Sequence, residues 1–149
     1  MGRRRRLTYL RAIVKQQHVR YALISTWCMA KTDINEIATW MGMGYIDRCD
    51  FFVGEIFKGS YQPEWIQLKE LCKQRHCRLV MFRNHSKIMV VFGDQFNCAI
   101  ESSANVNTNP RTEQTCITVD TELARFYKDI FDGVVSFDHS CDDVPPFRL

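Results

Sequence analysis

Apolar and polar residues follow one another along the chain in segments that predict strands and helices in turn. Three apolar, β-rich runs predict buried strands at residues 19–27, 50–56 and 78–82. A first helix is predicted after the first run, with Asp33 as its cap and an end at Gly42. A second helix is predicted to begin at Pro63 and to run to about Arg75, because proline suits the first turn of a helix.

The second half of the chain predicts three more strands and one helix. The strands are predicted at residues 86–92, 98–102 and 114–119. The helix has the clearest pattern, with apolar residues at i, i+3, i+4, i+7 and i+8, namely Leu123, Phe126, Tyr127, Ile130 and Phe131. This order of elements predicts an α/β (or α+β) fold, in which a mixed β-sheet carries helices on both faces.

The length of 149 residues is typical of one domain. We divide it into a basic N-terminal arm or helix at residues 1–18, a domain at residues 19–137 and an acidic tail at residues 138–149. No apolar run approaches the roughly 20 residues of a membrane helix, and the start does not resemble a signal peptide. The seven cysteines are then expected to be reduced, mostly buried thiols of a cytoplasmic protein.

The net charge of +3 is unevenly distributed. No acidic residue precedes Asp33, and the chain begins with four consecutive arginines, Arg3, Arg4, Arg5 and Arg6. A basic arm of this kind is the electrostatic footprint of a protein that binds polyanions, and a solvated terminus explains it equally well. The arginines are therefore candidate nucleic-acid-binding residues.

The candidate chemistry lies between residues 84 and 114. His85 and Lys87 are alternate residues of a predicted strand, so their side chains project to the same face. Ser103 and Asn105 repeat this spacing just after the next strand. If the two strands are neighbours, the four polar side chains converge on one pocket.

These residue types suit attack on a phosphate ester. A neutral histidine such as His85 can attack phosphorus, and Lys87 can neutralise the charge that grows on the non-bridging oxygens. Ser103 and Asn105 can donate hydrogen bonds to the same oxygens, and Glu113 can orient the imidazole. The scheme needs no metal and no cofactor, and zinc on Cys72, His76 and Cys77 is disfavoured by the C-x4-C spacing. The flanking arginines, Arg83 and Arg111, either bind neighbouring phosphates or are solvated.

The stretches HSKIMVVFGD, IESSANVNTN and PRTEQ together resemble the phospholipase D superfamily pattern of H-x-K, an acidic residue, G-S-x-N and a distal Glu. The order of elements is similar to the single-motif endonuclease branch found in bacteria and phages. The resemblance implies a phospholipase D-like fold and a homodimer in which His85 of each subunit meets its copy. It also implies a phosphohistidine intermediate at His85.

We therefore predict a metal-independent phosphodiesterase that acts on DNA or RNA rather than on a membrane. Two alternatives remain open. One is a non-catalytic module that binds nucleic acid or protein, and the other is a hydrolase of phospholipids or other small diesters.

Overall fold

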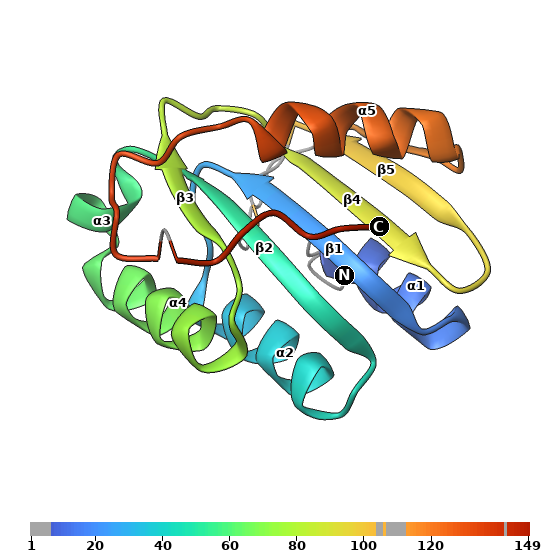
Figure 1. The fold of residues 1–149 in the computed structure, drawn as a ribbon, viewed down its shortest axis with the longest axis horizontal. Helices are drawn as coiled ribbons and strands as arrows, with labels where there is room; N and C mark the ends of the chain where they lie inside the picture. The colour runs from blue at the N-terminus through green and yellow to red at the C-terminus, as the bar shows by residue number, and fades with distance from the viewer. Residues whose placement is uncertain (1–6, 104–105, 107–112, 142) are drawn as a thin grey trace.

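The computed structural model describes residues 7–103, 106, 113–141 and 143–149. At its centre is a six-stranded sheet (Figure 1), with the strand order β3-β2-β1-β4-β5-β6. The strands are β1 (Val19–Thr26), β2 (Ile46–Gly54), β3 (Leu79–Phe82), β4 (Ile88–Gly93), β5 (Asn97–Ser102) and β6 (Thr115–Thr118). The helices are α1 (Leu7–Gln16), α2 (Lys31–Gly42), α3 (Phe57–Ser60), α4 (Gln62–Arg75) and α5 (Thr121–Asp132).

The sheet is mixed, and its two halves differ in direction. β1 pairs in parallel with β2, and β2 with β3, through connections that contain α2 and α4. β4 runs antiparallel to β1, and β5 and β6 continue in antiparallel order. The beginning of β4 therefore lies beside the carboxyl ends of the parallel strands, which is the edge where α/β sheets commonly bind ligands. The predicted fold class, a mixed sheet with helices on both faces, is confirmed.

Two apolar cores flank the sheet. The larger core packs α1, α2 and α4 against one face, with buried residues that include Leu10, Ile37 and Leu68. The smaller core lies on the other face, under α5, and includes Ala124 and Phe131. The helices occupy opposite sides of the sheet in Figure 1. The central strands are thus covered on both faces of the sheet, which explains why their sequences are nearly continuous apolar runs.

The N-terminal helix α1 belongs to the larger core. Leu7, Leu10 and Ile13 repeat at helical spacing and are all buried. The basic character of residues 1–18 concealed this amphipathic pattern. The start of α2 also differs from the expectation, because its N-cap is Ala30 and Asp33 lies buried inside the first turn.

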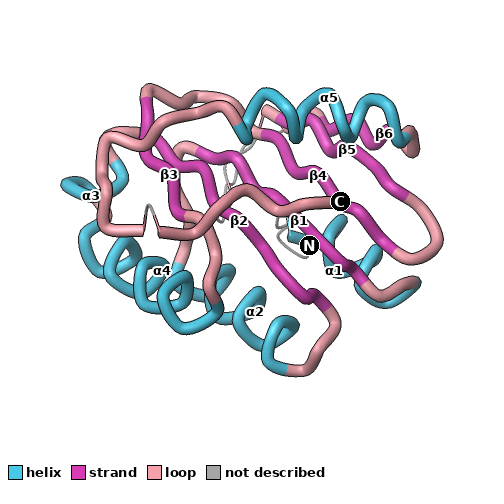
Figure 2. Tube along the Cα trace, viewed as in Figure 1, coloured by secondary structure: helices cyan, strands magenta, loops and turns pink. Residues whose placement is uncertain are grey.

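The segment that follows α5 returns across the molecule rather than leaving it (Figure 2). Asp138 pairs with Lys58 of α3 at 2.8 Å, and Phe147 stacks on Tyr21 of β1 with ring centroids 4.6 Å apart. Burial opposes ionisation of Asp138, but hydrogen bonds from Lys58 and Ser140 outweigh it and hold the carboxyl pKa well below its usual range. Among the described residues, no helix is both long enough and apolar enough to cross a bilayer.

Candidate functional site

The candidate site begins with a short connection that leads from β3 into β4. Asn84 is 4% exposed, and its side-chain amide donates to the Ser25 hydroxyl at 2.9 Å and to the Phe52 carbonyl at 3.0 Å. Its side-chain oxygen accepts from the backbone and the hydroxyl of Ser86, at 2.9 and 2.6 Å. Ser25 and Ser86 are also 2.6 Å apart. Asn84 and Ser86 therefore fasten this connection to the carboxyl ends of β1 and β2.

His85 and Lys87, the residues that alternate with these anchors, lie close together. Lys87 Nζ is 3.2 Å from His85 Nδ1 and donates to the His85 carbonyl at 2.9 Å. An ammonium group only donates, so Nδ1 accepts, and a neutral imidazole then carries its proton on Nε2. His85 is exposed and Lys87 half-buried. Together they present an N–H and a positive charge to solvent, which is an arrangement suited to an anion.

Trp27 packs beside this pair. Its ring centroid is 5.8 Å from that of His85, at an interplanar angle of 53°. The neighbouring strand end is a glycine, Gly54, and a Cβ at that position would collide with Cδ1 of Trp27. Gly54 thus leaves the space in which the indole lies against the imidazole.

Ser103 and Glu113 lie at the adjoining strand ends. The Ser103 hydroxyl donates to the Glu113 carboxylate, and the backbone of Ser103 donates to the carbonyl of Gln114 at 3.0 Å. The backbone of Ser102 donates to the carbonyl of Lys87, also at 3.0 Å. The ends of β4, β5 and β6 are therefore tied together. We call the group His85, Lys87, Ser103 and Glu113 the His85 edge.

The contacts within the His85 edge differ from those expected in one respect. The hydrogen bond to the imidazole comes from Lys87, whereas Glu113 accepts from Ser103. The role of Glu113 in orienting His85 stays a prediction. Asp94, the acid nearest in sequence after Lys87, lies at the other end of β4 and contacts His18.

Several predicted site residues lie outside the described residues. These are Asn105, Arg111, Arg3, Arg4, Arg5 and Arg6. Val106 is described, and it is buried and held at the end of β1 by hydrogen bonds to Thr26 and Ala30. Arg83 is exposed and directly precedes Asn84. Its contribution to substrate binding stays a prediction.

Sequence reasoning missed Asn84, Ser86 and Trp27. Asn84 and Ser86 stand on either side of His85, and their alternation with His85 and Lys87 was the available signal. The structure places residues 83–87 in the connection before β4 and not in the predicted strand, yet the alternation holds there, because Asn84 and Ser86 are tied to Ser25 of β1 while His85 is exposed. Trp27 is partly buried, packs against the larger core and also contacts His85.

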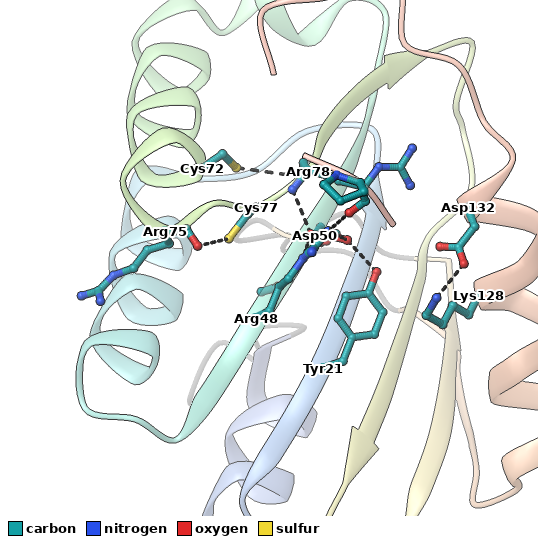
Figure 3. Close-up of polar contacts among 11 residues, drawn as sticks. Tyr21, Arg48, Asp50, Cys72, Arg75, Cys77, Arg78, Lys128 and Asp132 are labelled. Atoms are coloured by element: carbon teal, nitrogen blue, oxygen red, sulfur yellow. Dashed lines mark hydrogen bonds and ion pairs between the residues drawn. The ribbon is translucent and has the colours of Figure 1, made fainter. Parts of the chain in front are cut away.

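A second polar cluster lies buried in the middle of the sheet (Figure 3). Asp50 of β2 is fully buried and accepts from the Tyr21 hydroxyl at 2.8 Å and from the Arg48 guanidinium at 2.9 and 3.0 Å. The backbone of Arg78 donates to it at 2.9 Å. We call Tyr21, Arg48 and Asp50 the Asp50 cluster. The C-terminal segment covers it, since Arg48 also donates to the Pro145 carbonyl at 2.6 Å.

The Asp50 charge favours the protonated forms of both Tyr21 and Arg48. Burial and the neighbouring Asp50 charge raise the pKa of Tyr21 far above its usual range. Burial works against the charge of Arg48, but its hydrogen bonds to Asp50 outweigh that effect and raise its pKa. The cluster is thus a hydrogen-bonded ion pair in which Tyr21 keeps its proton and Arg48 keeps its charge.

The cysteines were expected to be mostly buried thiols. All seven lie in the described part of the chain as free thiols, and each except Cys116 is buried. In the ranges that the structure describes, no three His, Cys, Asp or Glu side chains are placed to hold a metal ion.

Comparison with known proteins gives one kind of match. No family model matches the chain, and no curated protein sequence matches it. Among solved structures, the chain is similar to a polyphosphate kinase from Porphyromonas gingivalis, with a TM-score of 0.56 and 20% sequence identity. The similarity covers 93% of this chain and 23% of the kinase chain. At this identity the match concerns the fold.

These comparisons overturn the assignment of the chain to the single-motif endonuclease branch of the phospholipase D superfamily. No family model supports the assignment, and the solved structure named above is a kinase rather than an endonuclease. The motif was short, and a few matching residue types on a widely shared kind of fold do not establish membership of a family.

Proposed function

We propose that the His85 edge binds a phosphate ester and that the protein is a metal-independent phosphodiesterase, with nucleic acid as its substrate. The observation that carries the proposal is the pairing of His85 with Lys87, 3.2 Å apart, on a connection fastened by Asn84 and Ser86. Such fastening keeps two reacting groups in place without substrate, which is how sites lower the cost of orientation.

The surroundings of the pair support the same chemistry. Lys87 supplies a positive charge, and the Ser103 hydroxyl stands at the adjoining strand end with the Glu113 carboxylate as its partner. Trp27 presents a ring that can stack on a base or shield the imidazole from water. The exposed Arg83 lies one residue before the fastened connection and can contact a flanking phosphate. The fold also occurs in an enzyme whose name denotes phosphoryl transfer.

The proposed reaction proceeds in two displacements. A phosphate that enters draws the Lys87 ammonium from Nδ1 to its non-bridging oxygens, so the ring proton can reside on Nδ1. Nε2 then forms a bond to phosphorus as the bond to the leaving oxygen breaks, and an acid protonates that oxygen. Water next attacks phosphorus and passes its proton to the group that protonated the leaving oxygen, while the P–N bond breaks, which releases the phosphate monoester and restores His85.

The acid in this scheme is His85 of a second copy of the chain. The exposure of His85 is compatible with a neighbour that approaches across a two-fold axis. Homodimerisation is a part of the proposal that rests on the need for a second proton donor. It is tested by the molar mass in solution.

The decisive experiment measures cleavage of a labelled oligonucleotide and of bis(p-nitrophenyl) phosphate in the presence of EDTA. We compare the wild-type protein with His85→Ala and with His18→Ala. His18 is the matched control, because it lies at the opposite end of β1 and β4 and pairs with Asp47 and Asp94. Loss of a nucleophile typically lowers the rate by several orders of magnitude.

The expected result is cleavage in EDTA that His85→Ala abolishes and His18→Ala preserves. Trapping of an acid-labile phosphoryl group on His85 would identify the intermediate. Binding of the oligonucleotide without cleavage, unchanged by His85→Ala, would overturn the proposal in favour of a binding module. Hydrolysis of the small diester alone would keep the chemistry and remove nucleic acid as substrate.

A further inference from the structure

Three cysteines surround a pocket on the side of the molecule where α4 ends. Cys72 lies in the last turn of α4, Cys77 lies two residues before β3, and Cys141 comes from the segment after α5. The pocket has a volume of about 280 Å³, and its other lining residues are Lys73, His76, Ser140, Asp143 and Val144. None of these residues belongs to the His85 edge.

The end of α4 brings two of these thiols together. His76 adopts a left-handed conformation, with φ 55° and ψ 52°, and ends the helix. The chain therefore turns back, and the backbone of Cys77 donates to the carbonyl of Cys72 at 2.9 Å. The Cys72 thiol donates to the carbonyl of Arg78 at 4.0 Å, and the Cys77 thiol donates to the carbonyl of Arg75 at 3.8 Å. The turn thus brings residues five positions apart into direct backbone contact, and a disulfide needs their Cα atoms within roughly 7 Å of each other.

The surroundings of the two thiols also shift their pKa values in opposite directions. The hydrogen bond from Cys72 lowers the pKa of Cys77 despite its burial. Burial raises the pKa of Cys72, and it raises that of Cys98, in β5, to about 11. The thiolate is the nucleophilic form of cysteine, so Cys77 is the more reactive member of the pair.

We propose that Cys72 and Cys77 form a redox-active dithiol site, which a hydroperoxide entering the adjacent pocket oxidises to a disulfide. Both thiols line a pocket that is several times larger than hydrogen peroxide needs, given that a water molecule takes up about 30 Å³ in the liquid. The site is independent of the phosphodiesterase chemistry proposed above.

The oxidation takes two steps. The Cys77 thiolate attacks one peroxide oxygen, the O–O bond breaks, and with one proton the products are a sulfenic acid on Cys77 and one water. The sulfur of Cys72 then attacks the sulfenic sulfur, its proton leaves with the hydroxyl group as a second water, and the S–S bond forms. Overall, two thiols lose two hydrogens and one peroxide is reduced to two waters.

The disulfide would link the end of α4 to the start of β3. Arg78, next to Cys77, donates its backbone N–H to Asp50 (Figure 3). Oxidation of Cys77 would therefore constrain the chain next to Arg78, whose backbone N–H contacts the buried Asp50. A thiol reductant reverses it.

The experiment treats the full chain with hydrogen peroxide, blocks the remaining thiols and maps disulfides after trypsin digestion. Trypsin cleaves after Lys69, Lys73, Arg75 and Arg78, so Cys72 and Cys77 fall in the separate peptides 70–73 and 76–78. A Cys116→Ser background removes the exposed thiol, which would otherwise join two copies. Cys141→Ser serves as the matched control from the same pocket.

The expected result is a loss of two hydrogens per chain and a linked 70–73/76–78 pair, reversed by dithiothreitol and retained in Cys141→Ser. Mapping the protein with Cys72 and Cys77 intact keeps the test valid even if serine variants of these residues fail to fold. A linkage that includes Cys141, oxygen adducts without any linked pair, or no mass change would each overturn the proposal.

Discussion

The Asp50 cluster lies on β1 and β2 and the His85 edge lies at the ends of β4, β5 and β6, so the two groups share one sheet but differ in exposure and in the contacts that hold them. Tyr21 and Asp50 are fully buried within β1 and β2, and Asp50 is hydrogen-bonded to both Tyr21 and Arg48. At the His85 edge, the buried residues are the anchors Asn84 and Ser25, whereas His85 itself is exposed. The comparison indicates that the strand centres supply stability, while the strand ends hold reactive groups within reach of solvent.

The largest effect is expected for Asp50→Ala. The substitution leaves the Arg48 charge, the Tyr21 hydroxyl and the Arg78 N–H without their buried partner. Removal of one member of a buried ion pair costs about 3–5 kcal/mol. Urea unfolding measures the loss in the free energy of unfolding. The control is Asp47→Ala, an exposed carboxylate of the same strand, for which we expect about 1 kcal/mol or less. Equal losses in the free energy of unfolding for Asp50→Ala and Asp47→Ala would contradict the stabilising role of the Asp50 cluster.

The next effect is expected for Asn84→Ala, which tests the anchors. It removes the side-chain bonds to Ser25, Phe52 and Ser86 and should lower stability by about 1–3 kcal/mol. If phosphodiesterase activity is found, the variant should also lower kcat, because His85 and Lys87 lose their fixed positions. Asn35→Ala, an exposed site on α2, controls for loss of an asparagine. Unchanged kcat in a folded Asn84→Ala protein would show that the anchors are unnecessary for the chemistry.

A smaller loss, about 1–2 kcal/mol, is expected for Tyr21→Phe, which deletes one hydrogen bond to Asp50 and keeps the ring. The ring still stacks on Phe147. The same substitution in an Asp50→Ala background should cost less, because the partner is already absent. A double-mutant cycle of unfolding free energies measures the difference, and strict additivity would refute the coupling.

The smallest effect concerns His18, which lies at the opposite end of the sheet from His85. The hydrogen bond to Asp47 raises the pKa of His18, burial acts against it, and the hydrogen bond to Asp94 adds to the rise. Its stabilising contribution is therefore complete below about pH 6.5 and fades as the pH rises through the higher folded pKa. The Tm difference between wild type and His18→Gln should be larger near about pH 5 than near about pH 8.5. A Tm difference that instead increased with pH would contradict this prediction.

The sequence predicted most of the fold, because the apolar periodicity of the strands and of α5 reflects their burial directly. It also predicted that His85 and Lys87 lie close together, which they do at 3.2 Å, although they stand in the connection before β4 and not within the predicted strand. It did not reveal the anchors, because Asn84 contacts Ser25 and Phe52, which are 59 and 32 positions away. The Asp50 cluster was hidden for the same reason, as Tyr21 and Asp50 are 29 positions apart. The assignment to a family was wrong, because a match over a few residues does not establish common ancestry.

The contacts of residues 143–149 determine which part of the protein opens first. It is held to the sheet by the Phe147 stack on Tyr21 and by the Arg48 bond to Pro145, and it adds no strand to the ladder. Its release is then a local opening that costs less free energy than global unfolding. Limited proteolysis should nick this segment first, and a dye that binds apolar surface should detect the uncovered face while the six strands remain paired.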